Sequence, residues 1–170
     1  MVSYYYSDLQ DKTKIPDNCT IFDCYNRNLT ELPELPDSLI KLCCDINNLT
    51  KLPKLPNSLE ILKCNDNILT ELPKLPRLLK TLICYDNKLI VLSELPDLLI
   101  EIYCSDNNLT ELPEFPKSLL YLVCYNNNIK YLSPNNCEVI KKCFKIDVLN
   151  NPFSANFTDN KDFKEYLMNL

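Results

Sequence analysis

The amino-acid sequence predicts an α/β solenoid in which short repeats stack into one elongated domain. Three observations support this prediction. Cysteine recurs every 20 residues at six positions, leucine and asparagine recur at fixed offsets from it, and most of the 12 prolines follow the same period. A unit of this length leaves no room for a helix beside its strand and turns. The cysteines that define the period are Cys24, Cys44, Cys64, Cys84, Cys104 and Cys124.

The strand of each repeat is predicted from alternation around the cysteine, in the unit LxxLxCxxNxLTxLPxLPxS. In the second copy, Leu42 and Cys44 point inward, whereas Lys41, Cys43 and Asp45 point outward. Identical strands one repeat apart pair in parallel, about 4.8 Å from each other. The sequence therefore predicts a single parallel sheet with one strand per repeat.

Asparagine and proline specify the rest of each repeat. Asparagine at positions 47, 67, 87, 107 and 127 can bond backbone groups where the chain turns, and its repetition forms a ladder. Paired prolines such as Pro33 and Pro36 keep the return segment extended and prevent a helix there. The result is a leucine-rich-repeat solenoid with a parallel β-sheet on the concave face and polyproline-like return segments on the convex face.

The two ends depart from the period and are expected to close the core. We expect an N-terminal cap at residues 1–18, six 20-residue repeats at 19–138, and a longer seventh repeat with a C-terminal helical cap at 139–170. Ser133-Pro134 begins a helix of about two turns, and Ile146, Val148, Asn151 and Phe153 repeat the inward pattern. Thr158 or Asp159 caps a final helix that runs to Leu170, with Phe163, Tyr166, Leu167 and Leu170 on its apolar face.

The repeat unit resembles the 20-residue leucine-rich repeats of bacterial effector proteins of the YopM/IpaH type, whose repeats also carry the LPxLPxSL run. Residues 19–138 carry the resemblance. It implies an adaptor or regulator of ubiquitin ligation, or another host-directed effector. The chain departs from the family in placing cysteine at the third inward position and in having no room for a ubiquitin-ligase domain after the repeats. The glycine-free, Asn-, Lys-, Ile- and Tyr-rich composition indicates an AT-rich genome, and we expect a giant DNA virus of amoebae as the source.

Composition excludes several classes of function. Without histidine there is no Ser-His-Asp or Cys-His catalysis, and without glycine there is no P-loop or dinucleotide fingerprint. A net charge of −5 disfavours sequence-independent nucleic-acid binding, and no apolar run approaches the roughly 18 residues of a membrane span. The N-terminus lacks the pattern of a signal peptide. We expect a non-enzymatic cytoplasmic protein, in the host cytoplasm if viral, with no cofactor and no metal.

The outward strand positions of the C-terminal half form the candidate binding site for a protein or peptide. The repeat does not require aromatic residues there, and exposed aromatic side chains mark protein interfaces. The alternative is that these residues only reflect β-propensity on an exposed sheet. The candidate partner-binding residues are Ile83, Tyr85, Tyr103, Tyr121, Val123 and Tyr125.

A second apolar group indicates self-association. Leu78 and Leu98 replace the serine of the other repeats, and Ile90-Val91 replaces the usual polar pair. Four apolar departures around one repeat suggest a contact surface, so the chain is expected to be a monomer or a weak homodimer. A structural, self-assembling solenoid is a further alternative.

Two columns of chemically reactive side chains are further candidate sites. The cysteine column is interpreted as core, because a linear column places at most two sulfurs near any metal ion. Cys43 points outward and is expected to be the thiol that reacts first. Asp66, Asp86 and Asp106 form an acidic column that either binds a cation or a basic partner or simply suits the turn before the asparagine.

Overall fold

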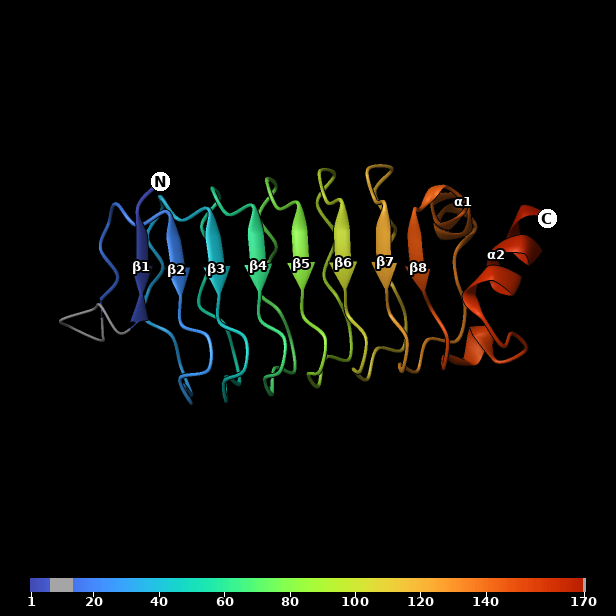
Figure 1. Cartoon of the computed structure of the whole chain (residues 1–170), viewed down its shortest axis with the longest axis horizontal. Helices are drawn as coiled ribbons and strands as arrows, with labels where there is room; N and C mark the ends of the chain where they lie inside the picture. Colours follow the sequence, from blue (N-terminus) through green and yellow to red (C-terminus); the bar gives the residue numbers. More distant parts are fainter. Residues whose placement is uncertain (7–13, 170) are drawn as a thin grey trace.

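A computed structural model describes residues 1–6 and 14–169, which form a solenoid around one eight-stranded parallel sheet (Figure 1). The strands follow chain order from β1 to β8, so each repeat contributes one rung. Their bounds are β1 Ser3–Tyr5, β2 Ile21–Asp23, β3 Lys41–Cys43, β4 Ile61–Lys63, β5 Thr81–Ile83, β6 Glu101–Tyr103, β7 Tyr121–Val123 and β8 Lys145–Asp147. The helices are α1 Pro134–Lys142, the short 3-10 helix η2 Pro152–Ser154, and α2 Asn160–Met168.

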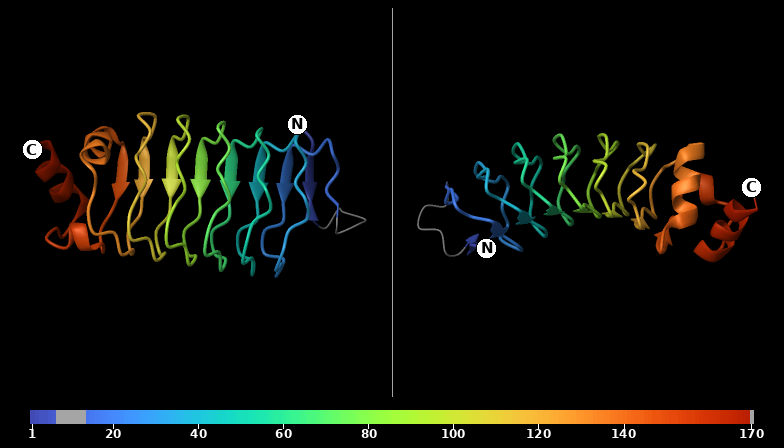
Figure 2. Two further views of the ribbon diagram at one scale, coloured as in Figure 1. Left: turned by 180° about the vertical axis from the view of Figure 1, so that it is seen from behind. Right: turned by 90° about the horizontal axis from the view of Figure 1, so that it is seen from above.

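The 20-residue period sets the register of the sheet. Leu42 pairs with Leu62, Leu62 with Leu82, and Ile102 with Leu122, so equivalent residues lie side by side. Figure 2 shows the sheet along the concave side of the arc, with the return segments along the convex side. The predicted leucine-rich-repeat architecture is therefore confirmed. The inward residue at the centre of each strand is fully buried in six successive rungs, at Phe22, Leu42, Leu62, Leu82, Ile102 and Leu122.

A buried asparagine closes the turn after each strand from β3 to β8 and bonds two rungs together. The side-chain amide of Asn87 donates to the carbonyls of Cys64, Cys84 and Tyr85, and its Oδ1 accepts the N–H of Leu69 at 2.9 Å. Backbone groups inside a solenoid have no water to bond, so this pattern satisfies them where the ladder bonds end. The asparagine ladder consists of Asn47, Asn67, Asn87, Asn107, Asn127 and Asn151.

The N-terminal segment contributes a strand of its own. Tyr4 in β1 lies in register with Phe22 of β2, and the Val2 N–H donates to the Thr20 hydroxyl at 2.7 Å. Tyr6 packs edge-on against Phe22, with ring centroids 6.5 Å apart. The predicted cap at residues 1–18 thus begins with an added rung, and its residues 7–13 lie outside the described part of the chain.

The C-terminal end combines a seventh full repeat with two helices. Ser133 caps α1 by accepting the Asn136 N–H, and Asp159 caps α2 by accepting the Asp162 N–H. Phe163 and Leu167 of α2 are buried, whereas Leu170 of the predicted helix lies outside the described residues. No helix within residues 1–6 and 14–169 has the length and apolar character to cross a bilayer.

Candidate protein-interaction surface

The outward side chains of β5, β6 and β7, together with the residues that follow β5 and β7, gather on the concave face. Register places Tyr103 directly between Ile83 and Val123, and Tyr121 beside Glu101. In a parallel sheet such cross-strand neighbours lie about 5 Å apart, within contact distance for aromatic rings. The fold therefore brings the six predicted residues onto one surface. This tyrosine patch consists of Ile83, Tyr85, Tyr103, Tyr121, Val123 and Tyr125.

The four tyrosines of the patch are partly exposed. Burial, followed by the charge of Glu101 and the nearby Tyr121, raises the pKa of Tyr103. Burial also raises the pKa of Tyr85, with Asp66 as the next largest cause. Both phenols therefore remain protonated near neutral pH and can donate hydrogen bonds to a partner.

Two outward positions are covered, contrary to what alternation alone predicts. Val123 is 7% exposed between Tyr103 and Asp147 in the neighbouring strands, so it lies beneath its neighbours. Cys43 is also 7% exposed, between Asp23 and Lys63, so the prediction of an exposed Cys43 thiol is wrong. In each case a small side chain lies beside one much larger side chain on a flanking strand, Tyr103 beside Val123 and Lys63 beside Cys43.

Phe144 extends the tyrosine patch and was not predicted. Its side chain is 79% exposed, and its ring centroid lies 6.3 Å from that of Tyr121. Phe144 immediately precedes β8, the strand of the longer seventh repeat. Because that repeat breaks the 20-residue period, stacking the sequence does not align Phe144 with the outward positions of the earlier strands.

Solved structures identify the repeat type. No family model and no curated protein matches this chain. YopM from Yersinia enterocolitica WA-314 is 36% identical with a TM-score of 0.73, over 78% of this chain and 29% of that one. A Shigella effector LRR domain is 30% identical with a TM-score of 0.73, over 91% of this chain and 68% of that one. This chain belongs to the leucine-rich-repeat family.

A third similar leucine-rich-repeat structure is described as having a cysteine ladder. The functional domain of InlJ from Listeria monocytogenes, described as including a cysteine ladder, is 28% identical with a TM-score of 0.65. The alignment covers 90% of this chain and 33% of that one. All three of these similar structures are of bacterial proteins, so they do not support the viral source expected from composition.

The cysteines of this leucine-rich-repeat chain are free and mostly buried. All ten are unbonded to one another, and Cys137 alone among them is partly exposed. Burial raises the pKa of Cys24 and of Cys104 to about 12, so these thiols stay protonated and behave as small apolar side chains. Within residues 1–6 and 14–169, no group of three Cys, Asp or Glu side chains is placed to hold a metal ion.

The second predicted apolar group divides into two parts. Leu78 and Leu98 are 45% and 46% exposed and line a groove of about 750 Å³ between the third and fourth repeats. Ile90 and Val91 are 54% and 47% exposed but do not line that groove. The hydroxyl of Ser58, at the position equivalent to Leu78 and Leu98, donates to the carbonyls of Asp37 and Leu39 in the preceding turn. A leucine side chain cannot make this bond.

Backbone conformation accounts for the type of residue in the acidic column. Asp66, Asp86 and Asp106 have φ near +52°, in the left-handed region that Asn and Asp tolerate better than other residues. Asn26 and Asn126 occupy the same turn position with the same conformation. Burial and then the charges of Asp66 and Asp106 raise the pKa of Asp86, so the neighbouring carboxylates disfavour its ionised form. The equivalent turn position in all seven repeats is Asn26, Ile46, Asp66, Asp86, Asp106, Asn126 and Asn150.

Proposed function

We propose that the chain is a non-enzymatic interaction module that binds a protein or peptide partner through the tyrosine patch. Similarity to the leucine-rich-repeat domains of bacterial effectors supports an interaction role. The proposal depends on the type of residue found at the outward positions. Partly exposed tyrosines occupy outward positions of β6 and β7 and the second residue after β5 and after β7, where the core requires no aromatic residue. The concave sheet face is then the binding surface.

Tyrosine suits this role because it offers a large contact area at a small cost in side-chain entropy. Its hydroxyl also bonds polar groups of a partner. Tyr103 lies at the centre, since both flanking strands contribute apolar neighbours at Ile83 and Val123. Central tyrosines of interfaces cost about 1–4 kcal/mol in binding when truncated. We therefore expect Tyr103 and Tyr121 to dominate the affinity.

Peptide selection on the immobilised chain tests the proposal without knowledge of the source. Peptides enriched from a displayed random library should bind the Tyr103→Ala/Tyr121→Ala variant at least about tenfold more weakly. The matched control, Ile61→Ala/Lys63→Ala, changes the same face in the N-terminal half and should retain binding. Circular dichroism and urea unfolding establish that both variants are folded. Undiminished binding by the tyrosine variant would refute the proposal.

The leucine groove supports a second candidate, a homodimer. Arg77 and Asp97 lie beside Leu78 and Leu98, so a two-fold arrangement sets each arginine near the aspartate of the other copy. In that arrangement the surface is self-complementary in charge. Light scattering at high concentration should show a dimer that Leu78→Ser/Leu98→Ser converts to a monomer. A wild-type chain that is monomeric at every concentration would rule it out.

A further inference from the structure

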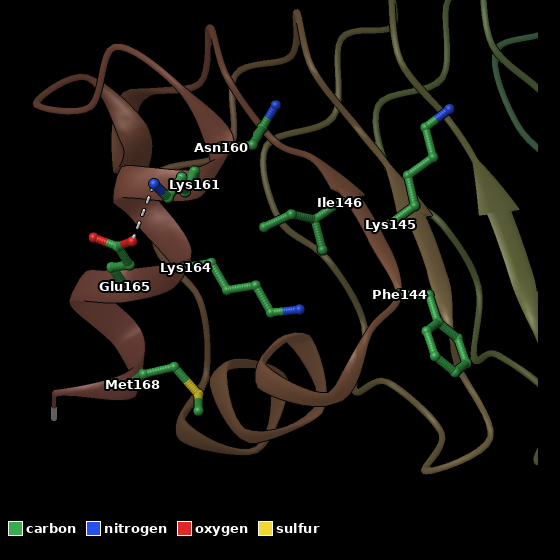
Figure 3. A pocket seen from close by; sticks show the side chains of 8 residues that line it. All are labelled: Phe144, Lys145, Ile146, Asn160, Lys161, Lys164, Glu165 and Met168. Carbon is green, nitrogen blue, oxygen red and sulfur yellow. Dashed lines mark ion pairs between the residues drawn. The ribbon is translucent and has the colours of Figure 1, made fainter.

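The last rung of the solenoid is less completely closed than the others. Ile146 occupies the inward position in register with Leu122, yet it is partly exposed where its six predecessors are fully buried. A cavity of about 490 Å³ lies over it, between β8 and α2. Figure 3 shows Ile146 beside this opening, with Met168 and Lys164 on the helix across from it.

The backbone of Ile146 at this edge of the sheet is also unpaired. The carbonyl of Asp147 accepts the Cys124 N–H and the Lys145 N–H donates to the Leu120 carbonyl, so residues 145 and 147 face β7. Ladder bonds alternate along a strand, and the N–H and C=O of Ile146 therefore point away from β7. Within the described residues the sheet ends at β8. An unpaired strand edge is a template for a further strand.

Helix α2 closes part of this edge and leaves the rest open. The Oδ1 of Asn160 accepts the N–H of Val148 at 2.9 Å. This N–H is the next one after Ile146 that points away from β7. Its side-chain amide donates to Asp147 at 3.0 Å. At the other end of the strand, the Nζ of Lys164 donates to the Cys143 carbonyl. The open part of the edge is therefore the N–H and C=O of Ile146, between these two bonds. It can accommodate a short extended segment.

The surroundings of the opening are basic and apolar, in a chain whose net charge is −5. Lys145, Lys161 and Lys164 line it, and the single acidic lining residue, Glu165, lies 3.7 Å from Lys161. Phe144 and Met168 add apolar surface, being 79% and 63% exposed. Three cations against one carboxylate favour an acidic ligand. The apolar pair favours a ligand with an apolar anchor.

We propose that the open edge of β8 binds an extended acidic peptide segment of a partner protein as an additional strand. One residue of the segment exchanges backbone hydrogen bonds with Ile146, its apolar side chain covers the cavity, and its acidic side chains lie near the lysines. Phe144 contacts Tyr121, so this edge adjoins the tyrosine patch. The two surfaces are nevertheless separate, because one uses side chains of the sheet face and the other uses its backbone edge.

Fluorescence polarisation with synthetic peptides tests the proposal. The probe is a short labelled peptide that alternates glutamate with leucine, and its matched control carries an N-methyl group on the central amide. Removal of that single donor should weaken binding at least about tenfold if the peptide pairs as a strand. Lys145→Glu/Lys161→Glu should weaken binding by a similar factor, whereas Lys88→Glu, at an exposed turn far from β8, should not.

Three outcomes would overturn the strand-addition proposal. These are no binding of the parent peptide at about 1 mM, equal binding of the N-methylated peptide, and undiminished binding by the double lysine variant. A dimer that forms through this edge and excludes the peptide would also overturn it. Tyr103→Ala should leave peptide binding unchanged. Failure at β8 is therefore distinguishable from failure of the tyrosine patch.

Discussion

The asparagine ladder and the tyrosine patch follow the same sheet with the same period, yet the sequence treats them differently. Every ladder position from Asn47 to Asn127 is asparagine, because each side chain bonds backbone groups of two rungs at once. The outward positions instead vary from rung to rung, for example Lys63, Ile83 and Tyr103 in neighbouring strands. The repeat keeps the residue type constant where the side chain bonds the backbone, and it lets the residue type vary on the concave face.

The largest effect is expected where that fixed requirement is broken. Asn87→Ala leaves the Leu69 N–H without a partner inside the core and removes one bond each from the carbonyls of Cys64, Cys84 and Tyr85, which keep bonds from neighbouring turns. An unsatisfied buried group costs about 1–3 kcal/mol and a lost hydrogen bond about 0.5–1.5 kcal/mol, so we expect the free energy of unfolding to fall by about 3 kcal/mol. Urea unfolding followed by circular dichroism measures the change.

Asn108→Ala is the matched control for this experiment. Asn108 is an exposed asparagine in the next repeat, and its N–H donates to the Leu89 carbonyl through the backbone, which alanine preserves. It should change stability by less than about 0.5 kcal/mol. Equal losses for the two variants would show that the asparagine ladder is not what joins the rungs.

The 20-residue period predicted from the sequence accounts for the repeated strands and turns. It does not account for the outward positions that are buried. Leu42, Cys44 and Asn47 lie where alternation placed them, because a one-residue slip would expose the core. Alternation gives a direction for each side chain, but exposure also depends on its neighbours. For that reason Cys43 and Val123, which lie beside Lys63 and Tyr103 of a flanking strand, are buried despite pointing outward.

The ends of the chain were harder to predict, because they depart from the 20-residue spacing. Tyr4 pairs with Phe22 at a spacing of 18 residues, and Ile146 pairs with Leu122 at a spacing of 24. The sequence predicted the inward role of Ile146. The opening above it depends on where α2 packs, which no local pattern specifies.

A second prediction concerns the turn position, where the repeat fixes a conformation but not a residue. Ile46 has φ of 53°, in a column otherwise occupied by Asn and Asp. The left-handed region costs an ordinary L-residue about 1–2 kcal/mol, more for a β-branched one, and Asn less. We therefore expect Ile46→Asn to raise the free energy of unfolding by about 1 kcal/mol in urea unfolding. Ile68→Asn, an equally exposed isoleucine outside the positive-φ column, should give no such gain.

The smallest expected effect separates charge from conformation at the same turn position. Burial and the charges of Asp66 and Asp106 raise the pKa of Asp86, so the folded chain holds this proton more tightly than the unfolded chain does. Ionisation of Asp86 therefore opposes folding, and its unfavourable contribution develops as pH rises through the raised pKa. Asp86→Asn removes the charge while keeping a residue suited to positive φ, as Asn126 shows at the equivalent position. We expect a gain of at most about 0.5 kcal/mol at pH 7, because the site is largely exposed and solvent screens the repulsion. The gain should disappear in acid, where Asp86 itself is protonated, and it should shrink in high salt.

Urea midpoints of the variant and the wild type across the acidic range measure this difference, with Asp97→Asn as an exposed control outside the column. A gain that persists unchanged in acid would show that the amide stabilises the turn for a reason other than charge.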